Sequence, residues 1–180
     1  MTVREIMVSK PACCQPEADL AVATALLCNH NCGALPVVDA KNQPVGMITD
    51  RDICIALGTR DKRAAEISVS QVMSGKVFAC DAGSDIRKAL DRMKKNHVRR
   101  LIVTEYGELK GMLSIDDIVL NIQWSDHSEV ELSFLDVIRV LRQVTYPVLA
   151  SETACANRSL APQTLRRNGQ KRRHIRLAES

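Results

Sequence analysis

A repeated segment constrains the fold of this chain more than any other feature of its sequence. The stretch GMITDRDI, residues 46–53, recurs as GMLSIDDI at residues 111–118. Upstream, VREIM at residues 3–7 matches VSQVM at residues 69–73, an offset of 66 residues. A repeat of this length predicts two copies of one structural unit. We expect the copies to pack together, because neither is long enough to bury a core alone.

Each copy has the hydrophobic pattern of a β-α-β-β-α unit. A short apolar stretch, PACC or KVFAC, precedes a segment whose apolar residues are three and four positions apart, which is typical of an amphipathic helix. Two short β-rich runs follow, separated by turn-forming residues. The last helix is expected to begin at Thr49 or Ser114, and Ser84 is expected to cap the longer helix of the second copy. The helix positions expected in the core are Leu20, Ala23, Leu27, Ile86, Ala89, Leu90 and Met93.

Composition distinguishes the repeats from the C-terminal part. The chain is 46% apolar but only 3% aromatic, so the core must be aliphatic. Residues 151–180 hold seven Lys or Arg and two acidic residues, whereas the remaining 150 residues, with 18 basic and 19 acidic side chains, are nearly neutral. The basic tail is predicted to be disordered. Before the tail, residues 128–144 have the pattern of an amphipathic helix that packs on the repeats or on a second subunit. Its apolar positions are Val130, Leu132, Leu135, Ile138 and Leu141.

The cysteines and the N-terminus exclude several classes of protein. Seven cysteines without a CxxC spacing argue against a disulfide framework and a zinc ribbon. The segment with Cys28, His30 and Cys32 has two interpretations, buried thiols or a thiol or metal sensor. No histidine is placed to activate a thiol, and no catalytic domain accompanies the repeats, so the chain is predicted not to be an enzyme. A charged N-terminus and short apolar runs predict a soluble cytoplasmic protein without a membrane span.

On these residues the chain resembles a tandem of CBS (cystathionine-β-synthase) domains, often called a Bateman module, and in particular bacterial stand-alone members. The matching residues are GALPVVD and GMITDRDI in the first copy, and VRRLIV and GMLSIDDI in the second. The resemblance covers residues 2–121 and implies an α+β fold of the α/β-type CBS kind, with two packed repeats. The expected boundaries are residues 2–60 and 61–122 for the repeats, 123–147 for the C-terminal helix and 148–180 for the basic tail.

The repeated hydroxyl and aspartate have two interpretations that do not exclude each other. Thr49 with Asp52, and Ser114 with Asp117, have the spacing of a capping box, which is worth about 1 kcal/mol. A carboxylate can also accept hydrogen bonds from both hydroxyls of a ribose. In CBS tandems this element binds ribose, so the resemblance implies ribose binding by all four residues.

Other positions are implied to contact the base and the phosphates. In many CBS repeats a basic residue before the LPV strand reaches the phosphates, which matches Arg99 and Arg100 in the second copy. The first copy has Gly33 and Ala34 there, so we expect unequal sites, with the second copy contributing more phosphate affinity. A solvated basic patch is the alternative. The resemblance further implies an adenine pocket, at positions that would also suit ordinary strand packing: Lys10, Ala12, Gly33, Ala34, Lys76 and Phe78.

The predicted function is a non-enzymatic sensor that binds AMP, ADP, ATP or another adenosyl ligand between the two repeats. It needs no obligatory cofactor, forms a homodimer, and signals to an unidentified protein partner by a conformational change. One alternative is a protein-interaction module without nucleotide, whose basic tail recruits nucleic acid. The other is the thiol or metal sensor.

Overall fold

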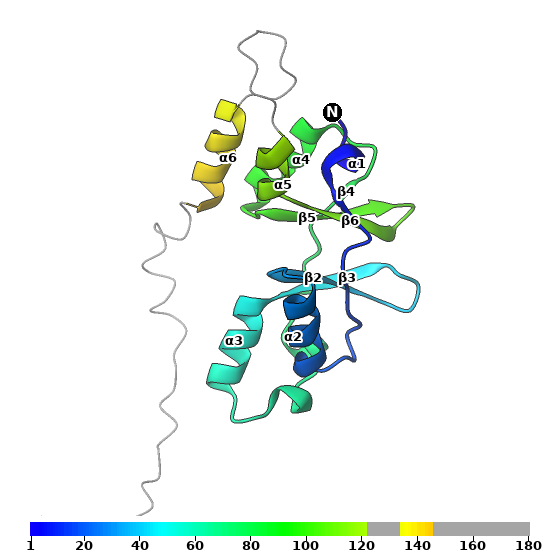
Figure 1. Cartoon of the computed structure of the whole chain (residues 1–180), viewed down its shortest axis with the longest axis vertical. Coiled ribbons are helices and arrows are strands. Elements are labelled where there is room, and N and C mark those ends of the chain that lie inside the picture. The colour runs from blue at the N-terminus through cyan, green and yellow to red at the C-terminus, as the bar shows by residue number, and fades with distance from the viewer. Residues whose placement is uncertain (122–133, 146–180) are drawn as a thin grey trace, which may run out of the picture. The chain divides into compact units, whose positions relative to one another are not determined.

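The two sequence copies form two similar halves (Figure 1). The structure, a computed structural model, describes residues 1–121 and 134–145. The first half contains α2 (Leu20–Asn29), β2 (Ala34–Val38), β3 (Pro44–Thr49) and α3 (Asp50–Thr59). The second half contains β4 (Ala79–Asp81), α4 (Ile86–Asn96), β5 (Arg100–Glu105), β6 (Glu108–Ser114) and α5 (Ile115–Asn121). The other elements are α1 (Val3–Ile6), β1 (Val8–Ser9), η1 (Ala64–Glu66), η2 (Val69–Gln71) and α6 (Phe134–Thr145).

The strands form two sheets that pack against each other. The first sheet has the order β1-β6-β5-β4, with β4 and β5 parallel and the other pairs antiparallel, and the second is the antiparallel pair of β2 and β3. Buried Val38, Ile102 and Leu109 form a small core shared by the two hairpins. The Leu109 N–H also donates to the Asn42 carbonyl at 2.9 Å. In Figure 1 the main helices of each half lie on the outer side of its hairpin, which confirms the predicted α+β fold of two packed copies.

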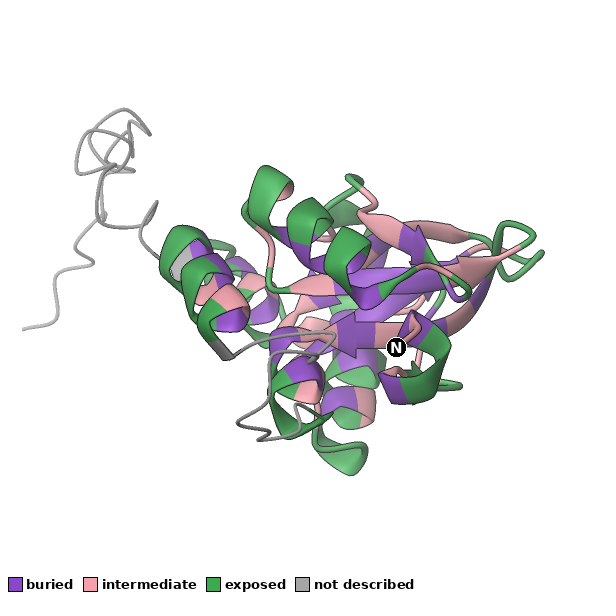
Figure 2. Ribbon diagram, turned by 90° about the horizontal axis from the view of Figure 1, so that it is seen from above, coloured by how far each residue is buried: buried purple, intermediate pink, exposed green. Residues whose placement is uncertain are grey.

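Burial confirms the predicted helix faces, with two local differences from the expected pattern. All seven helix positions expected in the core are buried, and Figure 2 shows buried residues on the strands and on one face of the helices. The PACC segment forms a single parallel bridge between Cys14 and Val37 in place of the expected strand. The N-cap of α4 is Asp85, whose side chain accepts from the Arg87 N–H, so the prediction of Ser84 is wrong by one residue.

The N-terminal segment of each copy, residues 3–8 in the first and 69–74 in the second, packs on the other copy. We call these two segments the leaders. The Val3 N–H donates to the Ser84 carbonyl at 2.9 Å, and the Val69 N–H donates to the Ala18 carbonyl at 2.7 Å. The offset of 66 residues relates these two hydrogen bonds, so the exchange is symmetric. Val3 and Ile6 are thereby buried in the core of the second half. Val69 is buried in the core of the first half.

The repeated glycines make room for the exchanged leaders. A Cβ added to Gly46 would lie 2.7 Å from the carbonyl oxygen of Ser74 and 2.8 Å from a methionine sulfur. A Cβ added to Gly111 would meet the sulfur of Met7 and would lie 3.0 Å from the carbonyl oxygen of Val8. Close approach of a crossing segment, rather than a turn, therefore requires glycine in both GMIT and GMLS.

Helix α6 packs on α4 and α5, through a face that differs from the predicted one. Leu141 is partly buried as expected, but the exposed fractions of Leu135 and Ile138 are 64% and 41%. The segment has apolar residues on more than one side, and contact with the second half selects among them. The α6 residues that join the core are Val137, Val140 and Val144.

Two of the predicted features lie outside the described residues. They are the start of the C-terminal amphipathic helix, including Val130 and Leu132, and the whole basic tail at residues 148–180. Among the helices that are described, none combines the length and the apolar character needed to cross a membrane.

Candidate functional site

Both hydroxyl–aspartate pairs form capping boxes. Asp52 Oδ2 accepts from the backbone N–H of Thr49 at 3.0 Å and from its hydroxyl at 2.7 Å. Asp117 Oδ2 accepts from the backbone N–H and the hydroxyl of Ser114, both at 2.7 Å. In return, each aspartate N–H donates to the hydroxyl oxygen, at 3.2 Å and 3.1 Å. Capping therefore engages Oδ2, and no described residue hydrogen-bonds to Oδ1 of either aspartate, which leaves that oxygen available to accept from a ligand.

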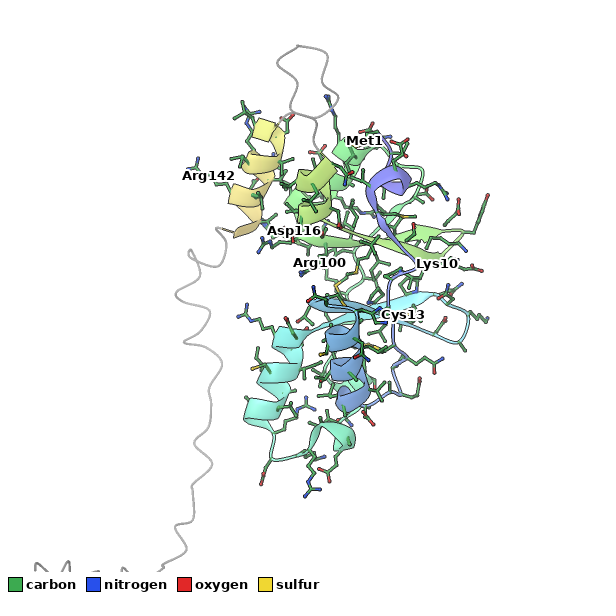
Figure 3. All side chains as sticks on the ribbon, in the orientation of Figure 1. Met1, Lys10, Cys13, Arg100, Asp116 and Arg142 are labelled. Carbon is green, nitrogen blue, oxygen red and sulfur yellow. The ribbon has the colours of Figure 1, made fainter. Side chains whose placement is uncertain are left out.

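The second of these pairs borders a cleft of 380 Å³, which we name the Ser114 cleft. Gly33 belongs to its wall, and a Cβ on this residue would lie 3.7 Å from Nη2 of Arg100 and 3.3 Å from Oδ2 of Asp50. In Figure 3, Arg100 and Asp116 lie near each other, and Lys10 lies where the chain leaves β1. The predicted site residues that line this cleft are Lys10, Ala12, Gly33, Ala34, Arg100, Ser114 and Asp117.

The first pair borders a second cleft, of 290 Å³, which we name the Thr49 cleft. The Lys76 ammonium lies 4.9 Å from the ring centroid of Phe78, a distance at which a cation–π interaction holds the charge at the cleft. Phe78 also gives this cleft an aromatic surface, whereas the aligned residue of the first copy is Ala12. The predicted residues that line the Thr49 cleft are Thr49, Asp52, Lys76, Phe78, Arg99 and Arg100.

Each cleft combines a hydroxyl–aspartate pair from one copy with the first-strand region of the other. The exchange of leaders explains this arrangement, because the chain that crosses to the other copy continues directly into the wall of that copy's cleft. All twelve predicted residues line one of the two clefts, and Arg100 lines both. Arg99, however, lines the Thr49 cleft, so the cleft that contains the hydroxyl–aspartate pair of the first copy also contains an arginine of the second. That these residues bind a ligand stays a prediction.

Several lining residues were missed by sequence reasoning. Asp116, His30 and Cys32 line the Ser114 cleft, and Ser74 and Val98 line the Thr49 cleft. The position of Asp116, next to Asp117, was a signal that could have been used. His30 and Cys32 were singled out only for the alternative thiol or metal sensor, and Ser74 and Val98 gave no signal, because only the packing of one copy on the other brings them to a cleft.

The cysteine cluster does not form a metal site in the described part of the chain. Cys28 is exposed, contrary to the expectation of a buried thiol, while Cys32 is half-buried. Across residues 1–121 and 134–145, no three His, Cys, Asp or Glu side chains are grouped so as to hold a metal ion. Burial raises the pKa of Cys14 and Cys80 to about 11 and also raises the pKa of Cys13, so these thiols are protonated at neutral pH.

Paired copies with two clefts between them define a tandem-repeat class of protein, and sequence comparison identifies the family. The family model that describes the CBS domain matches this sequence twice, at residues 3–59 and 69–123. The chain therefore belongs to the CBS domain family and contains two CBS domains in tandem. The CBS domain-containing protein YhcV of Bacillus subtilis is 31% identical over 127 residues, which cover 71% of this chain and 89% of that protein.

Solved structures confirm the fold. Hypoxic Response Protein I, solved with two coordinated zinc ions, superposes with a TM-score of 0.63 at 27% identity, over 68% of this chain and 100% of that chain. The CBS domain pair of protein MJ0100, in complex with 5′-methylthioadenosine and S-adenosyl-L-methionine, has a TM-score of 0.60 at 24% identity, over 67% of this chain and 94% of that chain. At this identity the second likeness supports the fold alone.

Proposed function

We propose that this chain is a non-enzymatic regulatory module that binds adenosyl ligands, such as AMP, ADP or ATP, in the two clefts between its CBS domains. The observation that carries the proposal is that the cap engages only one of the two carboxylate oxygens of Asp52 and of Asp117. In each, Oδ2 is engaged in the cap and Oδ1 accepts no hydrogen bond from a described residue. Such an oxygen suits the hydroxyls of a ribose.

The other walls of the clefts fit the remaining parts of such a ligand. Ala12, Gly33 and Ala34 are small enough for a base to approach the backbone of the first copy, and Phe78 offers a ring face in the second cleft. Arg99 and Arg100 can bind phosphate oxygens with two parallel hydrogen bonds. The complex of MJ0100 with 5′-methylthioadenosine and S-adenosyl-L-methionine is a precedent for adenosyl ligands in this fold.

A ligand in either cleft contacts both copies, and this is how we propose that binding becomes a signal. The ligand would favour the arrangement of the two halves in which both walls reach it. It shifts the equilibrium only by the difference in its affinity for the two arrangements. A protein partner in the cytoplasm, our proposed location, would recognise the favoured arrangement.

The test is the thermal stability of the full chain with adenosine, AMP, ATP and S-adenosylmethionine, and with GMP as a comparison. A ligand at one hundred times its Kd should raise the free energy of unfolding by about 2.7 kcal/mol. For a chain of this size the melting temperature should then rise by roughly 5–10 °C. We expect Asp52→Ala and Asp117→Ala each to remove the shift that arises from its own cleft, with phosphorylated ligands depending more on Asp52, because Arg99 lines the same cleft.

The matched controls are Asp19→Ala and Asp85→Ala, because these aspartates cap α2 and α4 but line neither cleft. They should lose about 1 kcal/mol of stability, as any N-cap does, and keep the full ligand-induced shift. If the fold is intact and no adenosyl ligand raises the melting temperature, the proposal is contradicted. The module would then be a protein-interaction unit, and its basic tail would be tested for nucleic-acid binding.

We also propose that two chains pair through the exposed face of α2 and α3. The α2 sequence contains no charged residue, and Val22, Ile55 and Leu57 on these helices are 47%, 50% and 39% exposed. The aligned position of Val22 in the second copy is Lys88, which lies on a strongly charged helix. Exposed apolar side chains on neighbouring helices are a feature of interaction sites.

Val22→Lys combined with Ile55→Lys should therefore convert a dimer to a monomer in sedimentation velocity, because two buried charges would face each other across a two-fold axis. Lys88→Ala is the control and should leave the sedimentation coefficient unchanged. A wild-type chain that sediments as a monomer at all concentrations would refute the pairing.

A further inference from the structure

The two clefts differ in charge although the repeat relates their walls. In the Thr49 cleft, Lys76, Arg99 and Arg100 face a single described carboxylate, that of Asp52. In the Ser114 cleft, Lys10 and the same Arg100 are matched by two carboxylates, those of Asp116 and Asp117. The Thr49 cleft is thus positive, whereas the Ser114 cleft, with His30 counted as neutral, has no formal net charge even when Arg100 is assigned to it.

Substitutions at aligned positions create this difference. Where the second copy has Arg99, the first copy has Gly33, so only the Thr49 cleft gains that guanidinium. Where the second copy has Asp116, the first has Arg51, and Arg51 is exposed and lines neither cleft. Both changes shift the Ser114 cleft away from positive charge.

Arg100 connects the two clefts because its side chain lines both. It lies on β5 opposite Ser114 in the β5–β6 ladder, and it reaches the wall formed by Gly33. A phosphate in the Thr49 cleft would attract this guanidinium together with Arg99, since charge-assisted pairs with phosphate are strong. The Ser114 cleft would then keep Lys10 against two carboxylates and become negative.

We propose that the two clefts bind adenosyl ligands of different charge. The Thr49 cleft takes a phosphorylated adenosine nucleotide, and the Ser114 cleft takes an adenosyl ligand without phosphate that is neutral or cationic. This inference rests on the proposed function, because it assumes that both clefts hold an adenosyl group. The charge division also predicts positive cooperativity between the two ligands. A phosphate that draws Arg100 into the Thr49 cleft removes a repulsive charge from a cation in the Ser114 cleft. By linkage, each ligand then raises the affinity of the other by the same factor.

The test is isothermal titration calorimetry on the full chain with AMP and with S-adenosylmethionine, whose sulfonium is cationic and which lacks phosphate. We expect one AMP per chain, and one S-adenosylmethionine that still binds when AMP is saturating, with higher affinity than without AMP. Arg99→Gln should weaken AMP about tenfold and leave S-adenosylmethionine within about twofold, because it removes one exposed charge-assisted contact to phosphate.

A charge reversal supplies the converse experiment. Asp116→Lys should weaken S-adenosylmethionine about tenfold and admit a second AMP, since it exchanges an attractive charge for a repulsive one within a few ångströms. Glu17→Lys makes the same change of net charge at an exposed residue that lines neither cleft, and it should alter neither ligand. Tight binding of AMP to both wild-type clefts, or equal responses of Asp116→Lys and Glu17→Lys, would overturn the charge division while the proposed function stands. A folded chain that binds neither ligand would overturn both.

Discussion

Replacement of either repeated glycine by alanine is expected to lower the free energy of unfolding by about 2–3 kcal/mol, in the upper range for an overpacked core. The reason is steric. The new methyl group of Gly46→Ala would lie 2.7 Å from a backbone oxygen, that of Ser74, which cannot rotate away as a side chain can. In Gly111→Ala the methyl would meet the Met7 sulfur and the carbonyl oxygen of Val8. Thermal denaturation should show melting temperatures lower by roughly 4–12 °C.

Gly58→Ala is the matched control. Gly58 belongs to α3, and a Cβ there would have no neighbour within 4 Å. Alanine should stabilise this helix by about 0.5–1 kcal/mol, because glycine loses more backbone entropy on folding. The same substitution is therefore expected to have opposite signs at different sites. If Gly46→Ala and Gly111→Ala were as stable as the wild type, the leaders would not cross the strands as described.

The second large effect concerns the exchange of the leaders. Val3 and Val69 are both fully buried and are related by the repeat, but each belongs to the core of the other half. Alanine at either position removes two methyl groups from a packed core, which costs roughly 2 kcal/mol. We expect Val3→Ala to loosen the second half, around α4 and β5, and Val69→Ala to loosen the first half, around α2 and β2.

Hydrogen exchange measured by mass spectrometry distinguishes the two responses, because it reports local opening segment by segment. Val3→Ala should accelerate exchange in peptides of residues 86–105, and Val69→Ala in peptides of residues 20–38. The two variants serve as controls for each other, since the chemical change is identical. If hydrogen exchange became faster only in the half whose own sequence contains the mutated residue, the proposed exchange of leader segments would be contradicted.

Much of this molecule follows from local sequence. The offset of 66 residues, the three- and four-residue spacing of Leu20, Ala23 and Leu27, and the β-rich runs each reflect one periodicity, and a periodicity determines which face of an element is apolar. The capping boxes at Thr49 and Ser114 were predictable for the same reason, because a cap joins residues only three positions apart. The residues of the two clefts were found through the family resemblance, which carries tertiary information that the spacing alone does not contain.

Other features depend on which surfaces meet, and local sequence does not encode them. The segment at α6 has apolar residues on more than one side, and only contact with α4 and α5 buries Val140 while leaving Leu135 exposed. That Arg99 lines the same cleft as Asp52 could not be deduced from either copy, because this cleft forms where one copy packs on the other. By itself the sequence determined the repeat, its elements and the kinds of side chain available to a site. The tertiary structure alone decided that the leaders exchange, since the burial of Val3 and Val69 depends on contacts between segments far apart in the chain, and that exchange gives each cleft its two walls.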